Sequence, residues 1–114
     1  MTRKVSVAKT KTDTTSETLY TIPTKNRGLW QLMYVASLTG TNSPSFIWYD
    51  KSANVSYTIF AGKNLGAGEY LLFTDAEVVL EEGDEIRIDQ TGTSQVTFLS
   101  TIELIPITAK QSHT

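Results

Sequence analysis

The sequence contains no cysteine and a single histidine, His113. Without cysteine, disulfides, thiolate nucleophiles and cysteine-based zinc or iron–sulfur sites are excluded. Serine–histidine or histidine–metal chemistry would need His113 to be held in place by neighbours, and residues so near a chain end usually fray. We therefore expect no enzyme: no catalytic residue, no metal site and no cofactor.

Long apolar stretches and an excess of positive charge are also missing. No run approaches the roughly 18–20 apolar residues of a membrane-spanning helix, and the basic residues 1–4 are not followed by the apolar segment of a signal peptide. The formal net charge is −2, whereas a protein dedicated to nucleic acid usually has a basic surface. These absences predict a soluble protein, made in the cytoplasm, that binds neither a membrane nor nucleic acid.

Threonine and serine take the place of much of the charge. Charged residues make up 19% of the chain, below the globular average of about 25%, and β-branched threonine favours a pleated, half-exposed surface. Short runs of alternating apolar and polar residues are separated by turn residues at a spacing of roughly 8–12. We predict an all-β fold, a single antiparallel β-sandwich of eight or nine strands, jelly-roll-like or immunoglobulin-like, with no significant helix.

The composition divides the chain into three parts. Residues 1–16 are polar and basic, with Val5 and Val7 alternating against polar neighbours, and are predicted to be an edge strand or a basic arm. Residues 17–108 are the predicted sandwich domain, and residues 109–114 a polar tail. Residues 69–89 carry many acids and a single cation. One interpretation of these acids is that they are solvated loop charges. The other hypothesis is that the arm docks on such an acidic surface, of a neighbouring copy or of a larger particle, through Arg3, Lys4, Lys9 and Lys11.

The longest apolar run is residues 29–39. Strict alternation places Leu29, Met33 and Val35 on one face of a strand and, on the other face, Trp30, Leu32, Tyr34, Ala36 and Leu38. One sheet-to-sheet contact in a sandwich covers only one of these faces. The second apolar face is therefore expected to be covered by another subunit, which predicts a homo-oligomer.

Acidic residues cluster around a glycine turn and are the candidates for a catalytic carboxylate pair: Glu81, Glu82, Asp84 and Glu85. Acids in a turn are normally exposed, so we interpret them as turn acids. The segment lacks the ligand spacing of an EF-hand calcium loop. Neither the dinucleotide-binding pattern nor the P-loop pattern is matched by the loop glycines Gly62, Gly66 and Gly68.

Large aromatic residues gather in the middle of the chain. As exposed rings they would stack on pyranose faces, as in a carbohydrate-binding sandwich, with Asp50 and Asn54 as the polar neighbours placed to bond sugar hydroxyls. As buried rings they would fill the core and a subunit interface, which is their commoner use. With the four cations of the arm, the candidate interaction residues are Trp30, Trp48, Tyr49 and Tyr57.

Several segments occur in an order typical of one group of proteins. Leu19-Tyr20-Thr21-Ile22-Pro23 is followed by Tyr34-Val35-Ala36-Ser37, then by Phe46-Ile47-Trp48-Tyr49-Asp50, and finally by residues 78–88 with their Leu-Glu-Glu-Gly-Asp-Glu-Ile core. This succession, over roughly residues 18–105, resembles the small β-sandwich virion proteins of tailed bacteriophages.

The resemblance implies a structural component of a phage particle, located in the virion. It would decorate or cement the capsid, or form part of the tail, as a self-associating subunit such as a trimer. Its other partners would be virion proteins such as the major capsid protein or tail subunits. The alternative function is that of a carbohydrate-binding β-sandwich module that mediates attachment to a glycan surface.

Overall fold

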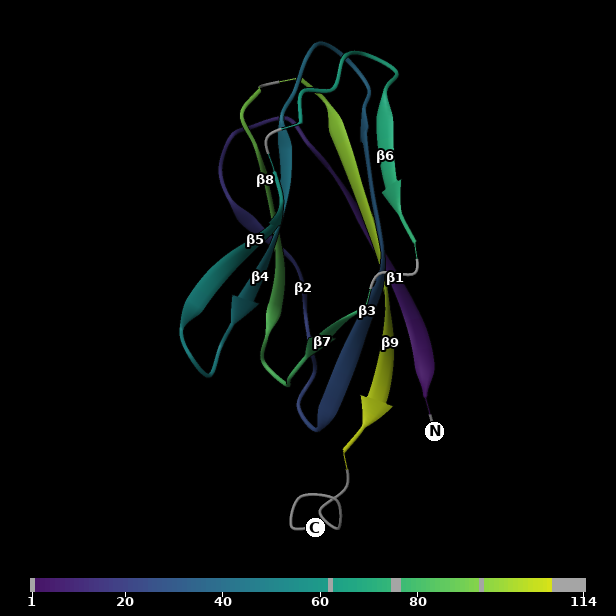
Figure 1. The fold of residues 1–114 in the computed structure, drawn as a ribbon, viewed down its shortest axis with the longest axis vertical. Helices are drawn as coiled ribbons and strands as arrows, with labels where there is room; N and C mark the ends of the chain where they lie inside the picture. The colour runs from purple at the N-terminus through teal and green to yellow at the C-terminus, as the bar shows by residue number, and fades with distance from the viewer. Residues whose placement is uncertain (1, 62, 75–76, 93, 108–114) are drawn as a thin grey trace.

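The protein is described by a computed structural model that covers residues 2–61, 63–74, 77–92 and 94–107. Across these ranges the chain forms nine strands and no helix, and hence no helix long and apolar enough to cross a membrane. The strands form two antiparallel sheets that face each other as two layers (Figure 1). The predicted all-β sandwich is confirmed.

One sheet has five strands and the other has four. The five-stranded sheet contains β1 (Arg3–Lys11), β3 (Asn26–Ser37), β6 (Tyr70–Phe73), β7 (Val78–Leu80) and β9 (Val96–Pro106). The four-stranded sheet contains β2 (Glu17–Thr21), β4 (Pro44–Asp50), β5 (Val55–Phe60) and β8 (Glu85–Gln90).

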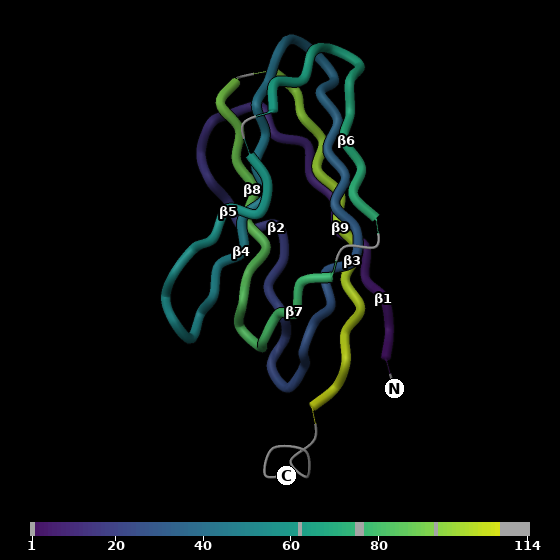
Figure 2. Tube along the Cα trace, viewed as in Figure 1, coloured from purple at the N-terminus to yellow at the C-terminus, as the bar shows by residue number. Residues whose placement is uncertain are grey.

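The chain crosses repeatedly from one sheet to the other, as the trace in Figure 2 shows. The strand orders are β1-β9-β3-β6, with β7 also paired to β3, and β2-β8-β4-β5. In an immunoglobulin-type sandwich the first two strands share a sheet, whereas here β1 and β2 lie in different sheets. The topology is therefore of the jelly-roll type.

Strands β8 and β9 show the alternation that the sequence predicts. In β9 the buried residues are every second one, Val96, Phe98, Ser100, Ile102 and Leu104. The residues between them are half-buried and face outward. This pattern arises because successive side chains of a strand point to opposite faces of the sheet.

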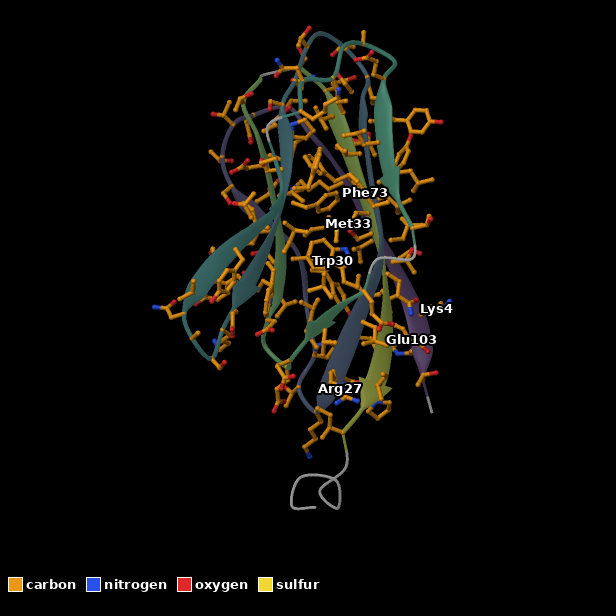
Figure 3. The ribbon with its side chains drawn as sticks, in the orientation of Figure 1. Lys4, Arg27, Trp30, Met33, Phe73 and Glu103 are labelled. Carbon is orange, nitrogen blue, oxygen red and sulfur yellow. The ribbon has the colours of Figure 1, made fainter. Side chains whose placement is uncertain are left out.

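Strand β3 departs from strict alternation. Its pairing with β9 shifts in register between Trp30 and Leu32, so Gln31 is an extra residue in a β-bulge. As a result Trp30 and Met33, three residues apart, are both buried, with 0% and 3% of their surfaces exposed, and both lie between the sheets in Figure 3. The prediction that Trp30 shares a face with Leu32 and Tyr34 is wrong.

Aromatic rings fill the centre of the sandwich. The ring of Phe46 lies edge-on to Trp30 at 5.6 Å and to Phe98 at 5.4 Å between centroids, a geometry that aromatic pairs prefer. The Trp30 Nε1–H donates a hydrogen bond of 3.1 Å to the buried Ser100 hydroxyl. This bond satisfies the one polar group of the indole, so Trp30 can be fully buried at low cost.

Candidate assembly surfaces

The acidic turn between β7 and β8 is held to the rest of the four-stranded sheet by the side chain of Asp84. The Asp84 carboxylate is fully buried. It accepts hydrogen bonds from Trp48 Nε1 at 3.0 Å, from the Lys51 backbone N–H at 3.0 Å and from the Glu81 backbone N–H at 2.9 Å. These bonds tie the turn to β4 and to the residue that follows it. Asp84 is therefore not an exposed turn acid as the sequence indicated.

The other acids of this turn have separate environments. Glu81 and Glu82 are exposed. Burial would raise the pKa of Glu85, but hydrogen bonds from the Thr18 hydroxyl and Arg87 Nε, at 2.7 and 2.8 Å, outweigh it and lower that pKa. Within the described residues, no group of three or more histidine, aspartate or glutamate side chains could hold a metal ion. His113 lies outside the described residues.

The basic N-terminal segment forms β1, an edge strand that pairs with β9 from Arg3 to Lys11. Arg3 and Lys4 are exposed, and Lys4 lies opposite Glu103 in register (Figure 3). Lys9 is also exposed, but its Nζ lies 3.0 Å from a carboxylate oxygen of Glu17 on β2. The charge of Lys9 is therefore already paired within the chain.

Lys11 is the cation that sequence reasoning placed wrongly. Its side chain is only 1% exposed, and its Nζ lies 2.7 Å from Asp13 Oδ1 and 3.2 Å from Glu17 Oε1. Burial would lower the pKa of Lys11, but these two carboxylates outweigh it and raise the pKa. Conversely, hydrogen bonds from Lys11 and Thr15 lower the pKa of Asp13 to about 2. The cluster closes the edge of the sandwich between β1 and β2, so Lys11 cannot dock on a partner in this structure.

The four candidate aromatic residues occupy three different environments. Trp30 is in the core and cannot reach a partner. Trp48 and Tyr57 pack together on the inner side of the four-stranded sheet, with ring centroids 5.2 Å apart. Tyr49 points to the opposite side of that sheet, where the Arg87 guanidinium covers its ring at 4.1 Å.

The polar groups that would accompany a sugar site are engaged inside the β4–β5 turn. The Asn54 side-chain oxygen accepts a hydrogen bond from the Tyr49 hydroxyl. The Asp50 carboxylate accepts one from the Ser52 hydroxyl at 2.9 Å. Because the rings lie on opposite sides of the sheet and these acceptors are occupied, the arrangement gives little support to a carbohydrate platform.

Eight large apolar side chains are exposed in the described part of the chain, and they form two surfaces. The first, which we call the outer face, is the solvent side of the five-stranded sheet and includes Leu38, Tyr70, Leu72 and Val79. The second, which we call the open edge, is the inner side of β5 together with the end of β6, and includes Val55, Tyr57, Ile59 and Phe73.

The outer face carries an apolar row that crosses four strands. The backbone register places Ala8, Leu99, Tyr34 and Leu72 side by side on β1, β9, β3 and β6. In the neighbouring row, the Tyr70 ring packs against the Tyr34 ring with centroids 5.9 Å apart. The outer face of β3 is thus apolar from Leu32 to Ala36, although its residues are not all those that strict alternation indicated.

The open edge borders a gap in the core. A cavity of about 190 Å³ is lined by Met33, Ile59, Phe60 and Phe73, and the rings of Phe60 and Phe73 lie with centroids 5.3 Å apart. Sequence reasoning selected only Tyr57 from this surface. The signal it missed is that β5 and β6, Val-Ser-Tyr-Thr-Ile-Phe and Tyr-Leu-Leu-Phe, contain no charged residue.

The fold and these surfaces define a jelly-roll β-sandwich with uncovered apolar patches. No family model matches the sequence, and no curated protein matches it. A chain of the disulfide-linked pili of Bacillus endospore appendages is similar in structure: it is 16% identical, the match covers 95% of this chain and 88% of that one, and the TM-score is 0.56. A chain of infectious bursal disease virus, Gt strain, is 8% identical, with 94% of this chain and 38% of that one covered and a TM-score of 0.44. The pilus chain shares the fold of this protein.

Proposed function

We propose that the protein is a non-enzymatic structural subunit that associates with copies of itself. The observation that carries this proposal is the apolar row on the outer face, Ala8, Leu99, Tyr34 and Leu72. Apolar surface left in water forgoes about 25 cal/mol per Å² relative to burial, and a contiguous exposed patch is a common sign of a protein–protein contact.

The assembly we propose is the virion of a tailed bacteriophage, in which the subunit decorates or cements the capsid or forms part of the tail. The order of sequence segments supports this assignment. A pilus chain has the same fold, and this similarity supports the proposal that the fold of this protein is suited to repeated assembly. Because these 114 residues contain no cysteine, the contacts they make would be non-covalent.

Light scattering tests self-association directly. We expect the molar mass in solution to be a multiple of 12.6 kDa and Leu72→Lys to lower that mass, because it places a charge in the apolar row. Thr24→Lys adds the same charge at an exposed position between β2 and β3 and should change nothing. A monomer at high concentration, together with the absence of the protein from purified particles, would overturn the proposal.

A further inference from the structure

Strand β5 has a free edge that carries exposed apolar side chains. β5 is the last strand of its sheet and pairs only with β4 there. The β4–β5 hairpin projects away from the body of the sandwich (Figure 1). Along β5, the alternating residues Val55, Tyr57 and Ile59 are 41%, 45% and 37% exposed. An apolar edge strand of this kind is a template for pairing with another strand.

The opposite side of the sandwich is protected against such pairing. There β1 carries exposed cations, and Lys9 and Lys11 bind Glu17 of β2 across the edge. Lysine on an edge strand is a common device that prevents edge-to-edge association. A contact between the open edge of one copy and β1 of another would set apolar side chains against charges. The partner of β5 must therefore be found elsewhere.

The sequence of β5 is symmetric in pattern about Tyr57. Val55 and Ile59 are apolar residues at equal distances from it, and Ser56 and Thr58 are hydroxyl residues at equal distances. We propose that β5 pairs antiparallel with β5 of a second copy about a two-fold axis at Tyr57. This inference rests on the proposed self-association and specifies one of its contacts.

The proposed register matches like with like on both faces of the new ladder. On the inner face, Val55 opposes the partner's Ile59, and Tyr57 opposes the partner's Tyr57. On the outer face, Ser56 opposes the partner's Thr58. Apolar, aromatic and hydroxyl cross-strand pairs of these kinds stabilise antiparallel sheets. Because β5 contains no charged residue, no like charges are brought together when two copies meet.

The geometry of the end of β5 also fits this occupant. Its pairing with β4 passes from Thr58 to Phe60, so Ile59 is an extra, bulged residue, and Ile59 and Phe60 both line the 190 Å³ cavity. In the proposed register the partner's Val55 lies beside Ile59, one of the residues that line that cavity. The second copy thus covers the cavity, and its backbone forms hydrogen bonds with the unpaired N–H and C=O groups of β5.

Cysteine cross-linking tests this register, and the cysteine-free chain gives no background. Directly opposed residues of antiparallel strands have Cα atoms about 4.5–5.5 Å apart, within the range of about 4.4–6.8 Å that a disulfide spans. In Tyr57→Cys the introduced thiols of two copies face each other. In Ser56→Cys they are diagonal neighbours at about 7–8 Å, beyond that range.

We expect Tyr57→Cys to form a covalent dimer of about 25 kDa, twice 12.6 kDa, under mild oxidation. Ser56→Cys alone should cross-link at least 10-fold more slowly, but a mixture of Ser56→Cys and Thr58→Cys should cross-link readily. Because Ser56 and Thr58 are exposed, this mixture tests the register even where Tyr57→Cys fails to fold.

Equal rates for Tyr57→Cys and Ser56→Cys would overturn the register. Absence of cross-linking in Tyr57→Cys and in the mixture, at concentrations where light scattering shows multimers, would overturn β5 pairing while leaving the proposed function intact. A protein that is monomeric throughout would overturn both.

Discussion

The buried carboxylate of Asp84 makes the sharpest prediction about stability. Its three hydrogen-bond donors come from the Trp48 side chain and from the backbone of Lys51 and Glu81. In Asp84→Ala all three donors lose their acceptor. Since the carboxylate is fully buried, we expect water to replace it poorly.

The magnitude follows from the chemistry of the donors. A hydrogen bond to a charged group contributes about 1.5–3 kcal/mol, and a buried donor left without an acceptor costs about 1–3 kcal/mol. Bonds that share one acceptor are not additive, so we expect Asp84→Ala to lower the free energy of unfolding by about 3–5 kcal/mol. Asp84→Asn keeps one carbonyl oxygen but turns an amide N–H₂ towards the donors, and should lose about half as much.

Urea unfolding followed by tryptophan fluorescence measures this loss, because Trp48 is one of the donors. Glu81→Gln is the matched control: it changes an exposed acid of the same turn and should cost less than about 0.5 kcal/mol. If Asp84→Ala loses under about 1 kcal/mol, or no more than the control, the carboxylate does not stabilise the turn as the hydrogen bonds indicate.

Two further predictions concern packing and acid stability. In Gly28→Ala the new Cβ would lie 2.7 Å from the Ile22 Cδ1 atom. The melting temperature should therefore fall by several degrees, which corresponds to an overpacking cost of about 1–3 kcal/mol. An unchanged melting temperature would show that Ile22 moves aside freely. The depressed pKa of Asp13, about 2 against an ordinary 3.8, means that its pairing with Lys11 stabilises the fold above pH of about 4 and is lost as the pH falls towards 2. Asp13→Asn should therefore lose less stability than the parent between pH of about 4 and 2, and equal slopes would contradict this assignment.

The all-β class was predictable because a strand buried on one face has apolar and polar residues that alternate along the sequence. In β8, for example, Ile86 and Ile88 are fully buried and Arg87 between them is not. A period of two is specific to strands. The same period of two is present in β9, where every second residue from Val96 to Leu104 is buried.

The bulge in β3 was not predictable by that rule. A single inserted residue shifts every later side chain to the other face, and Gln31 carries no turn signature that would mark it. Strict alternation therefore put Trp30 with Leu32, while the strand places it with Met33. That β3 is apolar on both faces did not depend on the register, and this part of the interpretation survived.

Of the two buried charges in the described residues, Lys11 could be predicted from the sequence and Asp84 could not. Lys11 has its partners two and six residues along the chain, at Asp13 and Glu17, so a local pattern of opposite charges was visible in the sequence. The side chain that Asp84 binds, Trp48, is 36 residues away. A buried carboxylate whose partners come from distant segments has no local signature, and only the fold brings them together.

The two sides of the sandwich are closed by different means, and this asymmetry limits how copies can join. On the side of β1 and β2, ion pairs join the two edge strands. On the opposite side, the free edge strand β5 carries apolar side chains and no charge. A two-fold contact uses the same patch on both copies, so by itself it forms a dimer and no larger assembly. If β5 pairs as proposed, a larger assembly therefore needs a second contact. The outer face meets this need, because it belongs to the other sheet and stays uncovered in the pair.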